Sequence, residues 1–305
     1  MTESGELLGA SRGNPLKAPS SKLIKNYLPL LSPAVLVLAA IVAFPTVYLL
    51  YVSLHQFFLS RPEFDFIGLG NFRLLAQSPD FWDSVRITII YVLSSATLTA
   101  TVGFVLAVLM SSALRARGLL RTIIVLPLII PPVVAGFSWK FLLSREVGLI
   151  GGWFLPQLGL QESLLAEPNL AMVSVLVADL WAKTPLMFLI FLAGLQAIPT
   201  ELYEVAALDG ASGFRLLKSI VIPLLRPTII LALVLRFIDA MNVFDLIFVM
   251  TSGGPGTATQ TLPLLGWKMG FVYFDLGQAS ALAVIMLILT SVPSSLLIRR
   301  LGRLA

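Results

Sequence analysis

Six long apolar runs constrain the fold of this chain more than any other feature of its sequence. A helix needs about 20 mostly apolar residues to cross the hydrocarbon core of a bilayer, and each run reaches that length. The runs cover residues 27–54, 86–112, 119–143, 169–196, 227–250 and 277–298. The sequence therefore predicts an all-α polytopic membrane protein with six transmembrane helices.

Composition supports this class and excludes several chemistries. Of the 305 residues, 57% are hydrophobic and 12% are charged, whereas soluble domains carry about 25% charged residues. The chain has no cysteine and one histidine, His55, so we expect no disulfide, thiolate metal site or Ser/His/Asp triad within it. We expect His55 itself at the surface or the membrane interface. The prediction therefore includes no catalytic residue and no metal ligand.

The positions of lysine and arginine predict the orientation of the spans. Cytoplasmic loops of membrane proteins carry an excess of these residues. Most of the 21 basic residues fall in the segments that are cytoplasmic when both termini are inside. Residues 1–26 then form a cytoplasmic tail, and residues 27–305 form the six-helix domain, whose first helix is retained rather than cleaved. Segment 199–226 becomes a cytoplasmic loop.

This loop has an unusual composition for its surroundings. ELYEVAALDG, residues 201–210, holds three acidic groups between apolar runs. We expect Thr200 to cap a short helix, with Glu201 and Glu204 near its positive end. Asp209-Gly210 ends that helix, and a second, basic helix covers about 211–221. Such a helix–turn–helix can dock a partner protein, or it can be an ordinary amphipathic interfacial loop.

The stretch YEVAALDGASGFRLLKSIVIPLLRP closely resembles the EAA coupling loop of ABC importer permeases. That family shows Glu-Ala-Ala, then Asp-Gly-Ala, then Ile-x-Leu-Pro and a further proline. The matching residues are Glu204, Ala206, Asp209, Gly210, Ala211, Leu217, Ile220, Pro223 and Pro227. Val205 and Ile222 are mild departures. The resemblance implies that the loop inserts into a groove on a separate ATPase, with Glu204, Ala206, Asp209, Gly210, Ala211 and Pro223 as coupling residues.

Other stretches resemble the carbohydrate branch of this family, the maltose and glycerol-phosphate permeases. They are FIGLGNF (66–72), WAKTP (181–185), LAGLQAIP (192–199), TSGGPGTATQTLPLLGW (251–267) and FDLGQASALAV (274–284). The resemblance implies a sugar-type solute, a bacterial or archaeal cell membrane, and a heteromeric complex. Its partners would be a second homologous permease, an ATPase dimer and an extracytoplasmic solute-binding protein, and none is a nucleic acid.

No nucleotide site is visible in the chain itself. GGPGTATQT lacks the Gly-Lys-Ser/Thr ending of a phosphate-binding loop. We therefore expect a non-catalytic permease without a cofactor of its own, with ATP and Mg bound by the partner ATPase.

The fourth run carries two charges, Asp179 and Lys183, one helical turn apart. A charge inside a span costs about 2.5–3.5 kcal/mol on insertion scales, so each needs a partner or a polar cavity. The two can form an ion pair with each other. Alternatively, Lys183 and Trp181 line a solute passage, where the indole offers an apolar face to a sugar ring and Pro185 frees carbonyls toward the cavity.

The fifth run carries Arg236, Asp239, Asn242 and Asp245, each three residues apart. Three residues advance about 300° on a straight helix, so Arg236 and Asp245 are predicted on opposite sides and not at one cavity. Arg236 can pair with Asp239, with Asp245 near the outer interface. Asn242, as donor and acceptor, and Phe244, as an apolar face, are expected to contact the solute. Asp239 binds sugar hydroxyls or serves only in the ion pair.

These residues define a predicted solute pathway: Trp181, Lys183, Arg236, Asp239, Asn242 and Phe244. The sequence leaves the charge of the solute open. Lys183 and Arg236 suit an anionic sugar, unless Asp179 and Asp239 neutralise them.

Two further points stay open in the sequence. The prolines of the third run, Pro127, Pro131 and Pro132, predict a fixed kink rather than a moving hinge. The alternative function is an ion-driven secondary transporter or channel that acts alone, with Asp179, Asp239 and Asp245 as proton or cation sites. No inverted repeat supports that alternative, and it leaves the docking loop unexplained.

Overall fold

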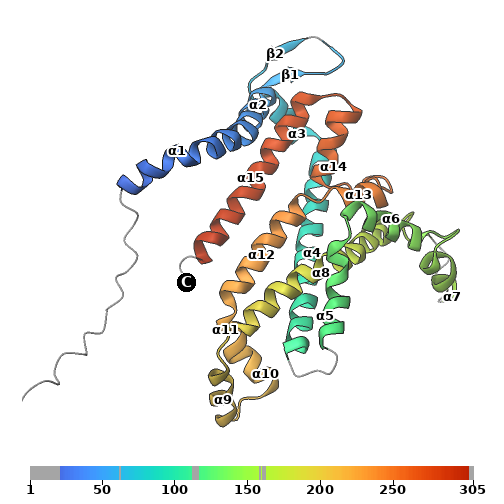
Figure 1. Ribbon diagram of the computed structural model, residues 1–305. Coiled ribbons are helices and arrows are strands. Elements are labelled where there is room, and N and C mark those ends of the chain that lie inside the picture. Colours follow the sequence, from blue (N-terminus) through green and yellow to red (C-terminus); the bar gives the residue numbers. More distant parts are fainter. Residues whose placement is uncertain (1–20, 62, 112–116, 158, 160–162, 302–305) are drawn as a thin grey trace, which may run out of the picture. The chain divides into compact units, whose positions relative to one another are not determined.

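The computed structural model describes residues 21–61, 63–111, 117–157, 159 and 163–301 (Figure 1). Most of the predicted N-terminal tail, residues 1–20, lies outside the described residues. The contacts divide the chain into two units, Met1–Leu49 and Leu50–Ala305, and each is described by itself.

The first unit is built on one apolar helical run. Helix α1 (Ser21–Leu38) is followed by the π-helical turn η1 (Ala39–Ala43) and by α2 (Phe44–Ser53), which continues into the second unit. Residues Pro29–Ser53 are long and apolar enough to cross a membrane. Most of their side chains are exposed and apolar all round, as expected for a helix whose environment is lipid or another chain.

The second unit is organised around four helices. Helix α4 (Pro79–Ser111) packs along α8 (Pro168–Gln196), and α12 (Arg226–Met241) packs against both α4 and α15 (Leu276–Leu301). Gly103 permits the close approach of α4 to α8, because a Cβ at this position would lie 2.6 Å from the Cβ of Met187. Small residues at such contacts are typical of packed membrane helices.

Four helices in the described chain are long and apolar enough to span a membrane, and six spans result if each bent pair counts as one. The prediction of an all-α membrane fold is therefore confirmed. The third predicted run is one of the bent pairs: α5 (Arg117–Val125) and η2 (Leu126–Ile129) meet α6 (Pro132–Leu143) at 101°. Pro131 and Pro132 cannot continue the helix, so the predicted kink is confirmed.

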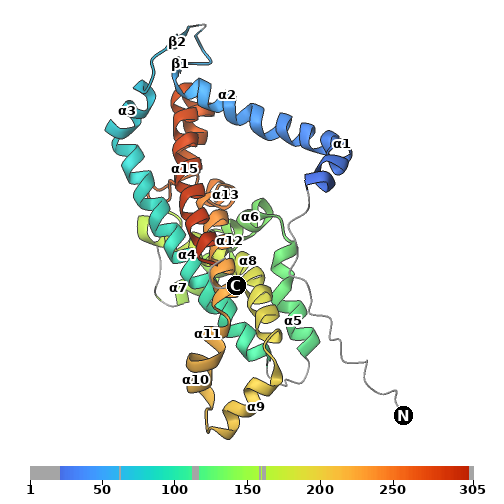
Figure 2. The ribbon, with the colours of Figure 1, turned by 90° about the vertical axis from the view of Figure 1, so that its left-hand side faces the viewer.

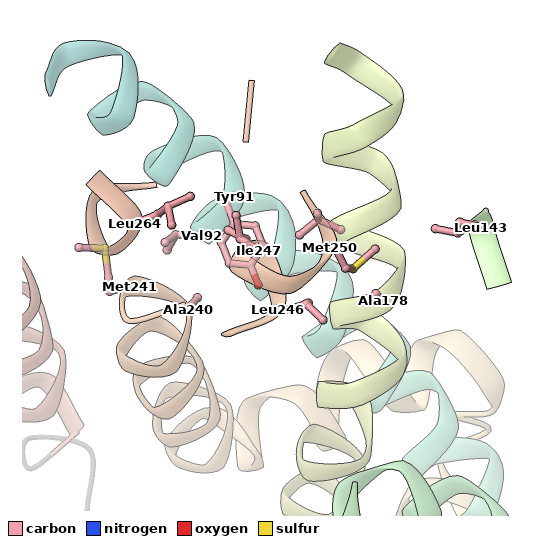
Figure 3. Packing of buried hydrophobic residues seen from close by; sticks show 11 residues of the cluster. Tyr91, Val92, Leu143, Ala178, Ala240, Met241, Leu246, Ile247, Met250 and Leu264 are labelled. Carbon is pink, nitrogen blue, oxygen red and sulfur yellow. The ribbon is translucent and has the colours of Figure 1, made fainter. Parts of the chain in front are cut away.

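The fifth predicted run, 227–250, is wrong as a single helix. Helix α12 ends at Met241, and the short α13 begins at Asp245 and ends at Met250. Apolar packing of the residues on both sides stabilises this break. Buried side chains of α13, among them Leu246, Ile247 and Met250, belong to one cluster with Tyr91 of α4 and Ala178 of α8 (Figure 3).

The loop between α8 and α12 contains the predicted pair of short helices. These elements are α9 (Thr200–Leu208), α10 (Gly213–Leu216), η4 (Leu217–Val221) and α11 (Ile222–Leu224). Within the second unit, both views place α9 and α10 at the end away from the hairpin of β1 (His55–Phe57) and β2 (Phe64–Phe66) (Figure 1, Figure 2).

The hairpin and several short helices were not predicted. Strands β1 and β2 are antiparallel, with His55 opposite Phe66. The other short elements are α3 (Gly70–Gln77), η3 (Leu149–Phe154), α7 (Leu155–Gln157), α14 (Leu262–Trp267) and η5 (Lys268–Val272). His55 is buried, contrary to our expectation: its ring stacks 4.4 Å from Phe64, and Nδ1 lies 2.7 Å from the carbonyl oxygen of Tyr51.

Candidate functional site

A polar cavity of about 210 Å³ lies where the two helix breaks come together. Leu128, Ile130 and Pro132 line it from the break before α6, and Asn242 and Phe244 line it from the break after α12. The remaining polar lining comes from α4, α8, α12 and the first residue of α13. Irregular backbone is tolerated at membrane depth where it faces such a cavity. The cavity therefore accounts for the position of the two helix breaks.

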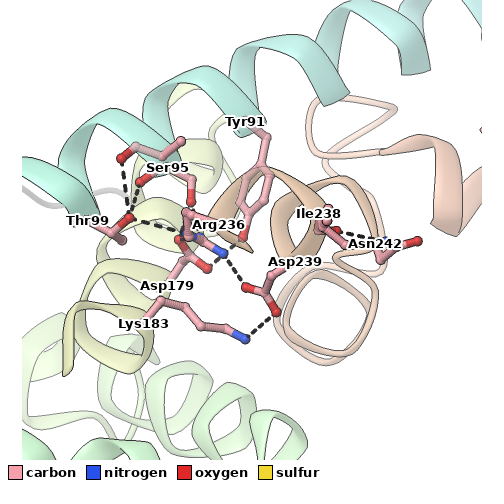
Figure 4. A network of polar contacts seen from close by, with 10 residues as sticks. Tyr91, Ser95, Thr99, Asp179, Lys183, Arg236, Ile238, Asp239 and Asn242 are labelled. Carbon is pink, nitrogen blue, oxygen red and sulfur yellow. Dashed lines mark hydrogen bonds and ion pairs between the residues drawn. The ribbon is translucent and has the colours of Figure 1, made fainter. Parts of the chain in front are cut away.

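Arg236 is the centre of the polar network on the inner wall of this cavity (Figure 4). Its side chain is only 2% exposed, and all three of its nitrogens donate hydrogen bonds. Nε donates to Thr99 Oγ1 at 3.3 Å, Nη1 donates to Asp239, and Nη2 donates to Ser95 and Asp179. The guanidinium thus connects α12 to both α4 and α8.

The side chain of Asp179 is as buried as that of Arg236, and both of its carboxylate oxygens accept hydrogen bonds. Tyr91 donates its hydroxyl to Oδ1 at 2.8 Å, and Ser95 donates to Oδ2 at 2.6 Å, alongside Arg236. The predicted ion pair between Asp179 and Lys183 is therefore wrong. The tertiary contact with α12 offers Asp179 a buried, hydrogen-bonded guanidinium, and this arrangement replaces the local pair along α8.

Asp239 binds both cations of the cavity. Lys183 Nζ lies 2.9 Å from Oδ1, while Arg236 contacts Oδ2. The predicted pairing of Arg236 with Asp239 is thus confirmed. The side chains of Lys183 and Asp239 are 29% and 43% exposed, so this pair forms the part of the network that faces the cavity.

The helix break brings Asp245 to the same cavity as Arg236, Asp239 and Asn242. The prediction that Arg236 and Asp245 cannot share a cavity is wrong, because it assumed a straight helix through Val243. Asn242 is exposed, and its Nδ2 donates to the carbonyl oxygen of Ile238 at 2.7 Å. That bond leaves the amide oxygen of Asn242 available to accept a hydrogen bond.

Trp181 is not among the residues that line the cavity. Its ring lies 6.1 Å from that of Trp139 on α6, at a steep angle. Helix α8 runs through the buried Pro185 without interruption. A role for Trp181 in the solute pathway remains a prediction.

Sequence reasoning missed the contribution of α4. Tyr91, Ser95 and Thr99 all take part in the network around Arg236 and Asp179. The sequence does contain a pattern that indicates this contribution. These three polar residues recur every four positions within an apolar run and therefore share one helical face.

The second candidate site is the exposed loop of α9 to α11. Helix α9 follows Pro199 as its N-cap, and no side chain caps it, so the prediction that Thr200 caps this helix is wrong. Glu201 lies in the first turn, as expected. Partial burial raises the pKa of the Tyr203 phenol above its ordinary value, so this side chain is neutral at physiological pH.

The turn of this loop is built on glycine. Gly210 has φ +71° and Gly213 has φ +52°, values that favour glycine. The backbone N–H of Ala211 donates to the carbonyl oxygen of the buried Ala206 at 2.8 Å and fixes the turn.

The loop presents acidic and apolar side chains together. Glu204 and Asp209 are exposed, and so are Leu208 at 88% and Phe214 at 77%. Pro223, at the far end of the loop, is half-buried in α11. Apolar and acidic side chains are therefore exposed on the same loop.

A membrane-type helical chain with a polar cavity and an exposed helical loop has the architecture of a transport permease. Residues 99–304 match the family of the binding-protein-dependent transport system inner membrane component, and the chain belongs to this family. It is therefore an inner-membrane permease of the ABC transport systems. The comparisons give no support to an ion-driven transporter that acts alone.

Several relatives are permeases named for a sugar or a sugar derivative. The trehalose/maltose transport system permease MalF of Thermococcus litoralis is 38% identical over 90% of this chain and 92% of its own length. The trehalose permease SugA of Mycobacterium tuberculosis is 32% identical over 90% and 88%. The sn-glycerol-3-phosphate permease UgpA of Agrobacterium fabrum is 36% identical over 74% and 77%.

The fold is similar to a solved structure. A chain of a bacterial ABC transporter involved in the import of alginate superposes with a TM-score of 0.79 at 22% identity, covering 92% of this chain and 98% of that one. At this identity the likeness concerns the fold alone.

Proposed function

We propose that this chain forms half of the translocation pathway of an ATP-driven importer for a sugar or sugar derivative. Relatives at 32–38% identity that are named for trehalose, maltose and glycerol phosphate support the solute class. The cavity between the helix breaks is the solute path in this chain. Lys183, Asp239, Asn242 and Phe244 are the residues through which it contacts the solute.

The complex contains a second homologous permease, a pair of ATPase subunits and an extracytoplasmic solute-binding protein. A related fold has been solved as an alginate transporter in complex with a solute-bound periplasmic protein, which supports the last partner. Both termini and the α9–α11 loop lie on the cytoplasmic side, where the ATPase binds ATP and Mg.

The observation that carries this proposal is the exposed loop of α9 to α11. Its exposed Glu204 and Asp209 stand beside the exposed Leu208 and Phe214, and its far end continues directly into α12. A movement of the loop is therefore transmitted to Arg236 and Asp239 through α12 alone. The ATPase would move the loop on ATP binding, and α12 would transmit that movement to the cavity in an alternating-access cycle.

The experiment that tests the proposal reverses one charge on this loop. Glu204→Lys should lose the co-purifying ATPase and ATP-dependent sugar uptake in vesicles, because the docking face then carries the wrong sign. Membrane insertion should not change. Glu63→Lys makes the same reversal at another exposed glutamate, next to β2, and should retain the ATPase. Undiminished ATPase recovery and uptake in Glu204→Lys would refute the docking role.

A further inference from the structure

We propose that the cavity selects an uncharged polyhydroxyl solute and rejects sugar anions such as phosphates and sulfonates. The inference rests on the proposed role of the cavity as the solute path. It follows from the ion pairs and hydrogen bonds that the charged groups of the cavity already form.

Arg236 is not available to an anionic solute. Its three nitrogens contact Thr99, Ser95, Asp179 and Asp239, and its side chain is 2% exposed. An anion that reached the guanidinium would have to displace Asp179 or Asp239. Displacement would leave a carboxylate without its cation in a buried site, which is strongly unfavourable.

Lys183 is the second cation of the cavity, and it is neutralised as well. Its Nζ lies 2.9 Å from Asp239 Oδ1, and the same carboxylate contacts Arg236 through Oδ2. An ammonium group has three donors, and this ion pair uses one of them. The other two N–H groups of Lys183 can donate hydrogen bonds to the oxygen of a hydroxyl group of the solute.

The charge balance of the lining adds to this selection. Among the described lining residues, two are cations and three are carboxylates, so the lining has a net charge of −1 when all are ionised. The unbalanced group is Asp245, which is exposed and forms no ion pair in the described part of the chain. Because like charges repel, this unpaired carboxylate disfavours an anion in the cavity.

The hydrogen-bonding groups of the cavity suit a sugar. The free amide oxygen of Asn242 accepts a hydrogen bond from a hydroxyl group, and Lys183 donates one. Phe244 adds an aromatic face for the C–H groups of a sugar ring. The cavity therefore offers acceptors, donors and an apolar face without a free positive charge.

The test compares matched sugars on the assembled importer without its binding protein, so that only the membrane subunits select. Saturation-transfer NMR is measured for trehalose against trehalose 6-phosphate, and for glycerol against glycerol 3-phosphate. We expect saturation of a neutral sugar or polyol and none of its phosphate. Equal or stronger saturation of a phosphate would overturn the proposal.

Uptake in vesicles, with the binding protein added back, separates this proposal from the proposed function. If the complete importer takes up a sugar with ATP but no neutral compound is saturated, the charge selection is wrong and the permease function stands. If the complete importer takes up no sugar, polyol or sugar phosphate with ATP, the sugar-importer function itself fails, and this proposal fails with it.

Charge variants provide the second measurement. Asp245→Asn removes the unpaired carboxylate, so affinity for the 6-phosphate should rise on the order of tenfold, with trehalose affinity changed much less. Asp65→Asn makes the same substitution at an exposed position on β2, outside the cavity, and should change neither affinity. An Asp245→Asn protein that gains no affinity for the phosphate would contradict the role of this carboxylate.

Discussion

Arg236 holds three helices together by a single side chain. It lies on α12, and its partners Asp179 and Ser95 lie on α8 and α4. Both members of the buried ion pair are almost fully enclosed. Removing one member of such a pair is costly, because the other remains as an uncompensated buried charge.

Arg236→Met should therefore destabilise the protein by about 3–5 kcal/mol, since it leaves Asp179 without a cation. The double substitution Arg236→Met with Asp179→Asn removes both charges and should recover most of the loss. Thermal unfolding of the detergent-purified complex, followed by size-exclusion chromatography, measures both effects. A single variant as stable as the parent protein would contradict the structural role of the pair.

At the scale of elements, four of the six apolar runs correspond to long continuous helices of the described chain, and the third and fifth runs are broken. The break at Pro131-Pro132 is readable, since two consecutive prolines remove two backbone donors and disfavour the helical conformation of the residues before them. The break at Asn242–Phe244 contains neither proline nor glycine, and its sequence alone predicts a continuous helix. Packing of α13 against α6 and α8 decides it.

The cavity, too, could be predicted from the sequence only in part. The charges of the fourth and fifth runs could be recognised as site residues from the sequence, but their partners depend on how the helices pack. Lys183 and Asp179 are one turn apart on α8, yet they contact different residues of α12, Asp239 and Arg236. Local spacing cannot predict such a choice between helices.

The contact of α4 with α8 gives a prediction on packing. Gly103→Ala places a methyl group 2.6 Å from Met187 Cβ and 2.9 Å from the backbone nitrogen of Phe188, so the helices must separate. We expect a loss of about 1–3 kcal/mol in stability, measured by thermal unfolding in detergent. Gly118→Ala on α5 meets no atom within 4 Å and serves as the control. Equal unfolding temperatures for the two variants would contradict the close contact.

The turn of the coupling loop gives a prediction on backbone conformation. Gly210 has φ +71°, and a Cβ there meets no atom within 4 Å, so only the backbone restricts substitution. Gly210→Val should distort the turn, at a cost of about 1–2 kcal/mol, and should abolish ATP-dependent uptake. Gly210→Asn should retain most uptake, because asparagine tolerates positive φ. If valine and asparagine support uptake equally, the turn geometry is not required for coupling.

At the scale of the whole molecule, the exposed surfaces describe a chain that works within an assembly. The helix Pro29–Ser53 exposes large apolar side chains along its length, and the α9–α11 loop exposes Leu208 and Phe214. Lipid covers the first kind of surface in a membrane, and we propose that the ATPase covers the second. Membership of the binding-protein-dependent transport family agrees with this need for partners.

The central claim is that this chain provides a solute path and a docking loop, and that a partner supplies the energy. The most direct test purifies the tagged chain from its native membrane in mild detergent, reconstitutes what co-purifies, and measures sugar uptake with and without ATP. We expect a co-purified ATPase and a second permease, with uptake only when ATP is hydrolysed. A chain that purifies alone and moves solute without ATP would contradict it.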